Sequence, residues 1–221
     1  MRTVQTSLPM SPDARCDVEN KGLLIVVSGP AGSGKGTVLA DLLQDGDYRY
    51  SVSATTRAPR EGEKDGVNYH YLGREEFEGR IARGEMLEYT EYCGNYYGTP
   101  KKEAEAVLAA GNNLLLEIEV EGAANNKKKY PDAVLIMLLP PSFAVQEARL
   151  RGRGTETEEK IMARLAQTKN ELTHVGEYDY VVYNLDGGVR AAADRIRAIV
   201  AAERAALKRN PRVAADYFAS V

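Results

Sequence analysis

The chain has 221 residues, 43% of them hydrophobic, and a formal net charge of −3 at pH 7. This length and hydrophobic content predict one large domain, or one domain with inserted lobes, around a sizeable core. The charge balance argues against a general nucleic-acid binder, and no apolar run is long enough for a transmembrane helix. The two cysteines, Cys16 and Cys93, form no disulfide or metal-binding pattern, which predicts a reducing, cytoplasmic setting.

The two ends of the chain are expected to lie outside the domain. Residues 1–20 carry several charged side chains and lack the apolar stretch of a secretory signal, which predicts a flexible extension. Residues 208–221 follow the last predicted helix and are assigned to a C-terminal tail. We therefore place the domain at residues 21–207.

A strand, a glycine-rich loop and a helix follow one another near the start of the domain. The branched apolar run 23–27 predicts a buried strand of a parallel sheet. It leads into residues 28–37, with the sequence SGPAGSGKGT, and then into apolar residues at helical spacing. This strand–loop–helix context is the one in which a phosphate-binding loop is credible.

The residue types of the loop suit polyphosphate binding. Glycines let the backbone curl so that successive N–H groups point into one hollow, and the helix adds its unpaired N–H groups and positive dipole end. Lys35 can reach the β- and γ-phosphates of such a ligand. The predicted phosphate-binding residues of the loop are Gly29, Pro30, Ala31, Gly32, Ser33, Gly34, Lys35, Gly36 and Thr37.

One position departs from the usual pattern of such loops. Gly36 stands where a serine or threonine normally contacts magnesium, and Thr37 follows it. Thr37 is therefore our candidate contact to the phosphate or the metal ion. The alternative for the whole segment is a glycine-rich turn that carries a surface lysine.

The rest of the chain alternates between strand and helix patterns. Residues 50–53 predict a short strand, and residues 54–100 are rich in tyrosine and short strands, which indicates a small lobe inserted into the core. In this lobe we expect strands at 69–72, 87–92 and 96–100 and a helix at 75–83. In the resumed core we expect helices at 101–108, 142–150, 155–174 and 187–207 and strands at 113–119, 133–139 and 180–183.

Two of these helices carry N-terminal capping signals. Ser142 follows two prolines and can cap the helix that runs to Leu150. Thr155 and Glu158 have capping-box spacing. The alternation as a whole predicts an α/β fold, with a parallel sheet covered on both faces by helices.

Three stretches make the chain resemble the guanylate kinases over residues 21–207. They are residues 28–38, residues 51–60 (SVSATTRAPR) and residues 94–99 (GNYYGT), with support from 151–159 and 178–184. The resemblance implies a P-loop kinase core (21–53 and 101–207), a GMP-binding lobe (54–100) and a mobile lid (149–160). It also implies magnesium-dependent phosphoryl transfer from ATP to GMP or dGMP, in guanine nucleotide recycling, with no obligate protein partner.

The resemblance assigns the GMP site to the inserted lobe. Arg57 and Arg60 would clamp the acceptor phosphate, because arginine forks match a phosphate dianion, and the hydroxyls of Tyr69 and Tyr97 would assist. Glu88 would accept from N1–H and N2–H of guanine, and the matching hydroxyls are those of Thr99 and Ser53. Without the family, these arginines read as a solvated loop, the tyrosines as half-buried packing and Glu88 as an exposed strand acid.

Two acids end a predicted core strand. Glu117 and Glu119 share one face of the strand and point at the ligand crevice. We expect Glu119 to order the GMP site and Glu117 to orient a magnesium-bound water or an arginine. The alternative is that both acids cap helices or pair with arginines.

The expected lid supplies cations for the transferred phosphoryl group. By resemblance these are Arg149, Arg153 and Arg164, whereas Arg151 is treated as a surface residue. Asn184 resembles the residue near the adenine of ATP, although Leu185 replaces the usual acidic neighbour. Without the pattern, each arginine could equally be helix-surface charge.

Three functional readings follow from the sequence. The first is an active guanylate kinase. The second is a catalytically inactive guanylate-kinase-like binding module, a class that has lost the phosphate loop, which this chain retains. The third is a kinase of another monophosphate, against which Glu88 and Thr99 argue, because adenine would present an acceptor to the carboxylate.

Overall fold

The computed structural model describes residues 21–92, 94–118, 120, 123, 127, 129–152, 154 and 156–218. Several expectations lie outside these residues: the N-terminal extension 1–20, Cys16, Cys93, Glu119, Arg153 and Thr155. Within the described part of the chain, no helix combines the length and apolarity that crossing a membrane requires.

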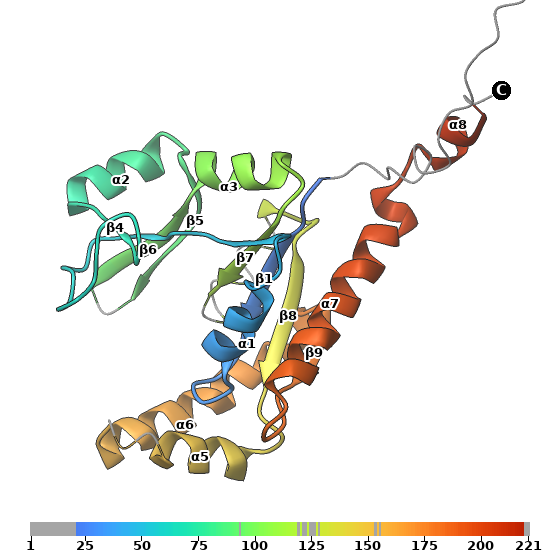
Figure 1. The fold of residues 1–221 in the computed structure, drawn as a ribbon. Coiled ribbons are helices and arrows are strands. Elements are labelled where there is room, and N and C mark those ends of the chain that lie inside the picture. The colour runs from blue at the N-terminus through green and yellow to red at the C-terminus, as the bar shows by residue number, and fades with distance from the viewer. Residues whose placement is uncertain are drawn as a thin grey trace, which may run out of the picture.

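A five-stranded parallel sheet forms the centre of the molecule (Figure 1). Its strands lie in the order β2, β7, β1, β8, β9. Their bounds are β1 Leu24–Ser28, β2 Tyr48–Tyr50, β7 Asn113–Glu117, β8 Val134–Leu139 and β9 Tyr180–Tyr183. Every residue of β1 is buried, as expected of a central strand covered on both faces.

Alternate residues of β1 pack into two separate hydrophobic clusters, one on each face of the sheet. Ile25 and Val27 pack in a cluster with residues of α1 (Lys35–Leu42) and α7 (Val189–Ala205). Leu24 and Val26 point the other way, into a cluster that includes Ala104 of α3 (Lys101–Ala109). The predicted α/β fold, a parallel sheet with helices on both faces, is therefore confirmed.

The strand order creates a crevice at the carboxyl end of the sheet. From β1 the chain passes through α1 to β2, on the far side of β7, whereas β7 leads on to β8, on the opposite side of β1. Loops that leave neighbouring strands in opposite directions open a ligand crevice between them. Helices α5 (Phe143–Gly152) and α6 (Glu158–Thr173) lie beyond this same end of the sheet (Figure 1).

A second sheet occupies the region predicted to be an inserted lobe. It has four strands in the order β4, β3, β6, β5, with bounds His70–Tyr71, Ala54–Thr55, Asn95–Pro100 and Met86–Tyr92. Helix α2 (Arg74–Ala82) covers it with Phe77, which is fully buried and stacks on Tyr96 at 5.2 Å between ring centroids. Figure 1 shows this sheet and α2 to one side of the core sheet.

Two local predictions need correction. The expected strand 50–53 is wrong: β2 ends at Tyr50 and β3 starts at Ala54, because the chain leaves one sheet and joins the other between them. The expected capping box is also wrong, since the N-cap of α6 is Thr157, and the Glu158 carboxylate accepts hydrogen bonds from Arg151 instead. The Ser142 cap is confirmed, with its Oγ accepting from the Val145 N–H at 3.3 Å.

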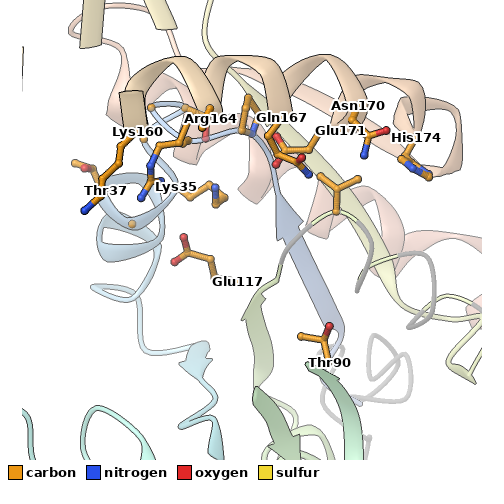
Figure 2. Close-up of a pocket in the computed structure, with 18 of the residues that line it drawn as sticks. Lys35, Thr37, Thr90, Glu117, Lys160, Arg164, Gln167, Asn170, Glu171 and His174 are labelled. Carbon is orange, nitrogen blue, oxygen red and sulfur yellow. The ribbon is translucent and has the colours of Figure 1, made fainter. Parts of the chain in front are cut away.

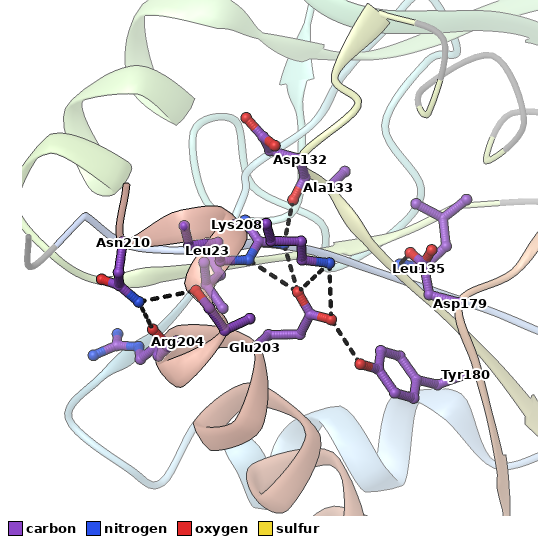
Figure 3. A network of polar contacts seen from close by, with 12 residues as sticks. Leu23, Asp132, Ala133, Leu135, Asp179, Tyr180, Glu203, Arg204, Lys208 and Asn210 are labelled. Carbon is purple, nitrogen blue, oxygen red and sulfur yellow. Dashed lines mark hydrogen bonds and ion pairs between the residues drawn. The ribbon is translucent and has the colours of Figure 1, made fainter. Parts of the chain in front are cut away.

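A buried carboxylate fastens the segment after α7 to the sheet (Figure 3). Glu203 accepts hydrogen bonds from the Tyr180 hydroxyl at 2.6 Å and from Arg209 Nε at 2.9 Å, and it pairs with Lys208 at 3.0 Å. Burial raises the pKa of Glu203, but the hydrogen bonds from Tyr180, Arg209 and Lys208 outweigh it and lower that pKa to about 2. The folded state thus favours the ionised form.

Replacing Glu203 with glutamine should therefore destabilise the fold. We expect the free energy of unfolding at pH 7 to fall by about 3 kcal/mol and Tm to fall by roughly 6–12 °C. Because the folded pKa is depressed, this contribution is complete above the ordinary value of 4.5 and is lost as the pH falls toward about 2. Urea unfolding of the wild type and the variant at pH 7 and pH 3 tests this. The control is Glu105→Gln on α3, which removes one carboxylate of an exposed ion pair. An equal loss of stability at both pH values would contradict the prediction.

Candidate functional site

A cavity of about 1040 Å³ lies at the carboxyl end of the core sheet. The loop from Pro30 to Thr37 lines one side, Glu117 at the end of β7 lies below it in Figure 2, and one face of α6 forms a wall. Thr90 of β5 lies on the far side in Figure 2, and its neighbour Glu91 also lines the cavity. The cavity therefore lies between the core and the second sheet, at the crevice that the strand order predicts.

The carbonyl oxygens of the loop are all engaged from Gly29 to Ser33. The donors, in order, are Lys35 Nζ (2.5 Å), the Ser33 N–H (3.1 Å), Gln146 Nε2 (2.9 Å), Arg149 Nη1 (3.5 Å) and Asn184 Nδ2 (2.8 Å). In a planar trans peptide the C=O and the following N–H point in opposite directions. The carbonyls of Pro30, Ala31 and Ser33 therefore turn the N–H groups of the next residues the other way, as an anion-binding hollow requires. Pro30 itself has no N–H, and the N–H of Ser33 is already bonded to the Pro30 carbonyl.

Two glycines of the loop have no room for a side chain. A Cβ on Gly29 would lie 2.1 Å from the Leu138 carbonyl oxygen, and one on Gly34 would lie 2.3 Å from Asn184 Nδ2. Gly34 also has a φ of +86°, in the left-handed region, where it precedes the first turn of α1. The helix that starts at Lys35 thus presents its unpaired N–H groups at the cavity.

The candidate metal-binding residues line the same cavity. Thr37 lies on the first turn of α1, and Glu117 is paired with Val27 across the sheet and accepts from the Tyr50 hydroxyl at 3.4 Å. Magnesium takes oxygen ligands, commonly one or two carboxylates together with substrate phosphates and water. A hydroxyl and a carboxylate beside the phosphate loop fit that chemistry.

The expected lid arginines have different surroundings. Arg149 on α5 pairs with Asp186 at 2.7 Å, donates to the Asn184 carbonyl at 2.9 Å and reaches Gly32, so it joins the loop to the segment after β9. Arg164 on α6 lines the cavity and pairs with Glu156 at 2.9 Å. Asn184 is buried and, in addition to its expected place near ATP, holds the loop at Ser33.

The sequence reasoning missed the wall formed by α6. Its cavity-lining residues include Lys160, Gln167 and Glu171, with Arg164 between them. These positions repeat at intervals of three and four, so they share one helix face, and that spacing was available in the sequence. His174 also lies on this wall, where its Nδ1 is 2.8 Å from Glu177.

Two of the three proposed guanine-binding residues meet in the second sheet. Glu88 and Thr99 are directly opposed across β5 and β6, and the Thr99 hydroxyl donates to Glu88 Oε1 at 2.8 Å. Glu88 is only 7% exposed. Burial raises the pKa of its carboxyl, and the hydrogen bond from Thr99 and the charge of Lys129 oppose that shift. Ser53 lies just before β3, half-buried, with its carbonyl bonded to His70 N–H.

Three of the proposed phosphate-binding residues also cluster. The guanidinium of Arg57 lies 5.6 Å from the ring centroid of Tyr69, whose ring meets that of Tyr97 edge-on at 6.1 Å. Arg60, by contrast, is exposed.

Glu63, which the sequence reasoning missed, pairs its negative charge with Arg57 in this cluster. Both of its carboxylate oxygens accept from Arg57 Nη2, at 2.9 and 3.0 Å. Hydrogen bonds from the Arg60 backbone, the Tyr71 hydroxyl and Arg57 lower the pKa of Glu63 to about 2. Nothing in the local sequence distinguishes this acid from its neighbours.

Comparison with known proteins agrees with this architecture. The protein-family model described as guanylate kinase matches residues 21–201. The chain is 47% identical over 196 residues to the guanylate kinase of Desulfitobacterium hafniense, covering 88% of this chain and 97% of that protein. It is 53% identical over 186 residues to the guanylate kinase of Halalkalibacterium halodurans, covering 84% and 90%.

A solved structure gives the same result. The crystal structure of guanylate kinase from Anaplasma phagocytophilum superposes with a TM-score of 0.69 at 35% identity, covering 86% of this chain and 90% of that one. The family model matches residues 21–201, and the two bacterial relatives are 47% and 53% identical to this chain over most of its length. The chain belongs to the guanylate kinase family.

Proposed function

We propose that this chain is an active guanylate kinase, which transfers the γ-phosphoryl group of ATP to GMP or dGMP and releases ADP and GDP. The observation that carries the assignment is the buried pair Glu88 and Thr99 at 2.8 Å. A carboxylate accepts from two guanine donors, and a neighbouring hydroxyl can donate to O6. Adenine would leave the buried carboxylate facing an acceptor, which supports guanine over adenine.

The acceptor phosphate would bind beside Arg57. An arginine guanidinium binds phosphate oxygens through several directed N–H groups, and the hydroxyls of Tyr69 and Tyr97 lie on rings next to it. Arg60 would reach the same anion from the exposed loop. Because a phosphate oxygen is already ionised, the reaction needs no general base, and catalysis consists of positioning and charge stabilisation.

The donor phosphates would bind in the loop from Gly29 to Thr37. Lys35 and the N–H groups of the first turn of α1 would hold the β- and γ-phosphates. Arg149, Arg153 and Arg164 would offset the charge that develops on the transferred group. Closure of residues 149–160 over the site would exclude water, which otherwise competes for the phosphoryl group.

Thr37 and Glu117 would hold the magnesium ion, which would neutralise charge on the phosphates. Glu119 would order the GMP side of the site. The phosphate loop, Lys35 and the engaged loop carbonyls all support an active kinase over an inactive binding module. We place this activity in the cytoplasm, where guanine nucleotides are recycled.

A coupled assay of ADP release tests the proposal. With ATP and Mg²⁺ present, we expect turnover with GMP and dGMP, and none above background with AMP, CMP or UMP. Turnover with AMP instead would retain the phosphoryl chemistry and overturn the roles of Glu88 and Thr99. Tight GMP binding by calorimetry, without turnover on any monophosphate, would favour the binding module.

A further inference from the structure

We propose that Gln146 is a positioning residue of the phosphate loop. Its side chain ties the loop at Ala31 to α5, which carries Arg149, and to α6, which carries Arg164. The inference rests on the proposed function of the loop as an ATP site. The Gln146 side chain does not line the cavity. It has no part in the proposed contacts to the phosphates or to guanine.

Gln146 connects three segments that are distant in the sequence. Its side-chain amide on α5 donates to the Ala31 carbonyl at 2.9 Å and to Thr168 Oγ1 on α6 at 2.7 Å. An amide nitrogen has two protons, so one group supplies both bonds. Thr168 passes its own proton on to the Arg164 carbonyl at 3.0 Å. The loop, α5 and α6 are thereby joined through a single polar relay.

Both side chains of this relay are buried. Gln146 is 1% exposed and Thr168 is 2% exposed. Leu150, Ile161 and Leu165 form a buried cluster against which Ala31 packs. Because the Gln146 amide is buried, its N–H groups have no water to bond if they lose their acceptors, so the hydrogen bond favours one position of the loop.

The loop also lies directly on α5. A Cβ placed on Gly32 would come within 3.3 Å of both the Gln146 carbonyl oxygen and Leu150 Cγ. The loop therefore lies so near α5 that a side chain at residue 32 would be crowded, and the φ of +84° at Gly32 also favours glycine. Contact from Gly32 and the hydrogen bond at Ala31 together fix the loop against the helix.

The relay is placed to align the cations with the phosphates. Gln146 lies three residues before Arg149 on α5, and Thr168 lies four residues after Arg164 on α6. Each is thus about one helical turn from an arginine of the proposed phosphoryl-transfer site. Displacements of about 1 Å in such a site can reduce rates by about a hundredfold, so a bond that sets loop and arginines in register has a catalytic consequence.

The variant Gln146→Met tests the proposal, because methionine keeps the length and volume of the side chain and removes both donors. We expect kcat to fall and the Kd of a non-hydrolysable ATP analogue, measured by calorimetry without GMP, to rise, each by about tenfold. The Kd of GMP alone should stay within about twofold, because the GMP site lies in the other sheet. The analogue Kd does not depend on GMP turnover, so it separates failure of this inference from failure of the proposed function.

Two further variants separate positioning from stability. Thr168→Val keeps the bond to Ala31, so we expect the analogue Kd to change by less than about threefold while kcat falls, since only the tie to α6 is lost. Ile196→Val, in the buried cluster of α7, lowers Tm without touching the relay and should leave both parameters unchanged. Gln146→Met with a lowered Tm, but with kcat and analogue Kd within twofold of the wild type, would reduce Gln146 to a packing residue and overturn the inference.

Discussion

Replacing Lys35 with alanine is expected to lower kcat by at least about a hundredfold, the usual cost of one charged contact to a transition state. The ammonium group lies in the loop, where it bonds the Gly29 carbonyl at 2.5 Å and lines the cavity. When ATP binds, it can exchange that carbonyl for phosphate oxygens, whose charge grows during transfer. Alanine offers no such exchange, and water cannot supply a fixed positive charge in its place.

Steady-state kinetics with saturating ATP and GMP would measure this loss. Lys102→Ala, at an exposed position on α3, is the matched control and should retain wild-type turnover. Circular dichroism should show the same fold for both variants, since Lys35 contributes no buried packing. Wild-type turnover in Lys35→Ala would remove the loop from the chemistry and, with it, the proposed function.

The variant Glu88→Gln should raise the KM for GMP by at least about a hundredfold and leave the KM for ATP within about twofold. The amide presents an N–H₂ group to the N–H groups of guanine, and mismatched buried polar groups are strongly rejected. The Thr99 hydroxyl can still donate to the amide oxygen, so the local packing survives. Glu105→Gln on α3, which removes an exposed carboxylate, should change neither constant.

The same variant should be more stable than the wild type. Burial raises the pKa of Glu88 in the folded state, so Glu88 binds its proton more readily folded than unfolded. Its effect on stability is therefore most favourable at low pH and declines as the pH rises through that raised pKa. At pH 7 we therefore expect Glu88→Gln to raise Tm above that of the wild type; a lower Tm would contradict this account of the buried charge.

The pH dependence of GMP binding follows from the same shift. GMP needs the ionised carboxylate, so its KM should rise as the pH falls through the raised pKa of Glu88, above the ordinary value of 4.5. The phosphate of GMP titrates near pH 6 as well. Comparison with Glu88→Gln, which retains only the phosphate titration, isolates the contribution of Glu88.

Elements with a strong local signal could be predicted from the sequence. The buried run that became β1, the glycine loop and the helix after it depend on residues adjacent in the chain, and all three are found as expected. The short strand predicted at 50–53 failed for a tertiary reason. Ser51 to Ser53 carry the chain from one sheet to another, and a pattern of alternating residues does not record which sheet each strand joins.

In the candidate site, too, some contacts could be predicted from the sequence and others could not. The Glu88–Thr99 pair follows from two strands joined by a short turn, so the sequence brings the two residues close. The acids that pair with the arginines could not be predicted. They are Glu63, Asp186 and Glu156, which lie on exposed or irregular segments, where the sequence does not indicate which arginine an acid will contact. Gln146 lies beyond pattern reasoning altogether, since its role depends on how α5 and α6 dock on a loop 115 residues earlier.

The engaged carbonyls of the phosphate loop have a consequence for the order of folding. Three of their donors, Gln146, Arg149 and Asn184, lie 115, 117 and 151 residues after the atoms they bind. Contacts of such long range carry a large chain-closure cost and form late. During synthesis the nucleotide-binding motif would therefore emerge early from the ribosome but acquire its shape only after the last core strand has been made. A nascent chain that ends before Asn184 would contain the complete motif without the structure that makes it an ATP site.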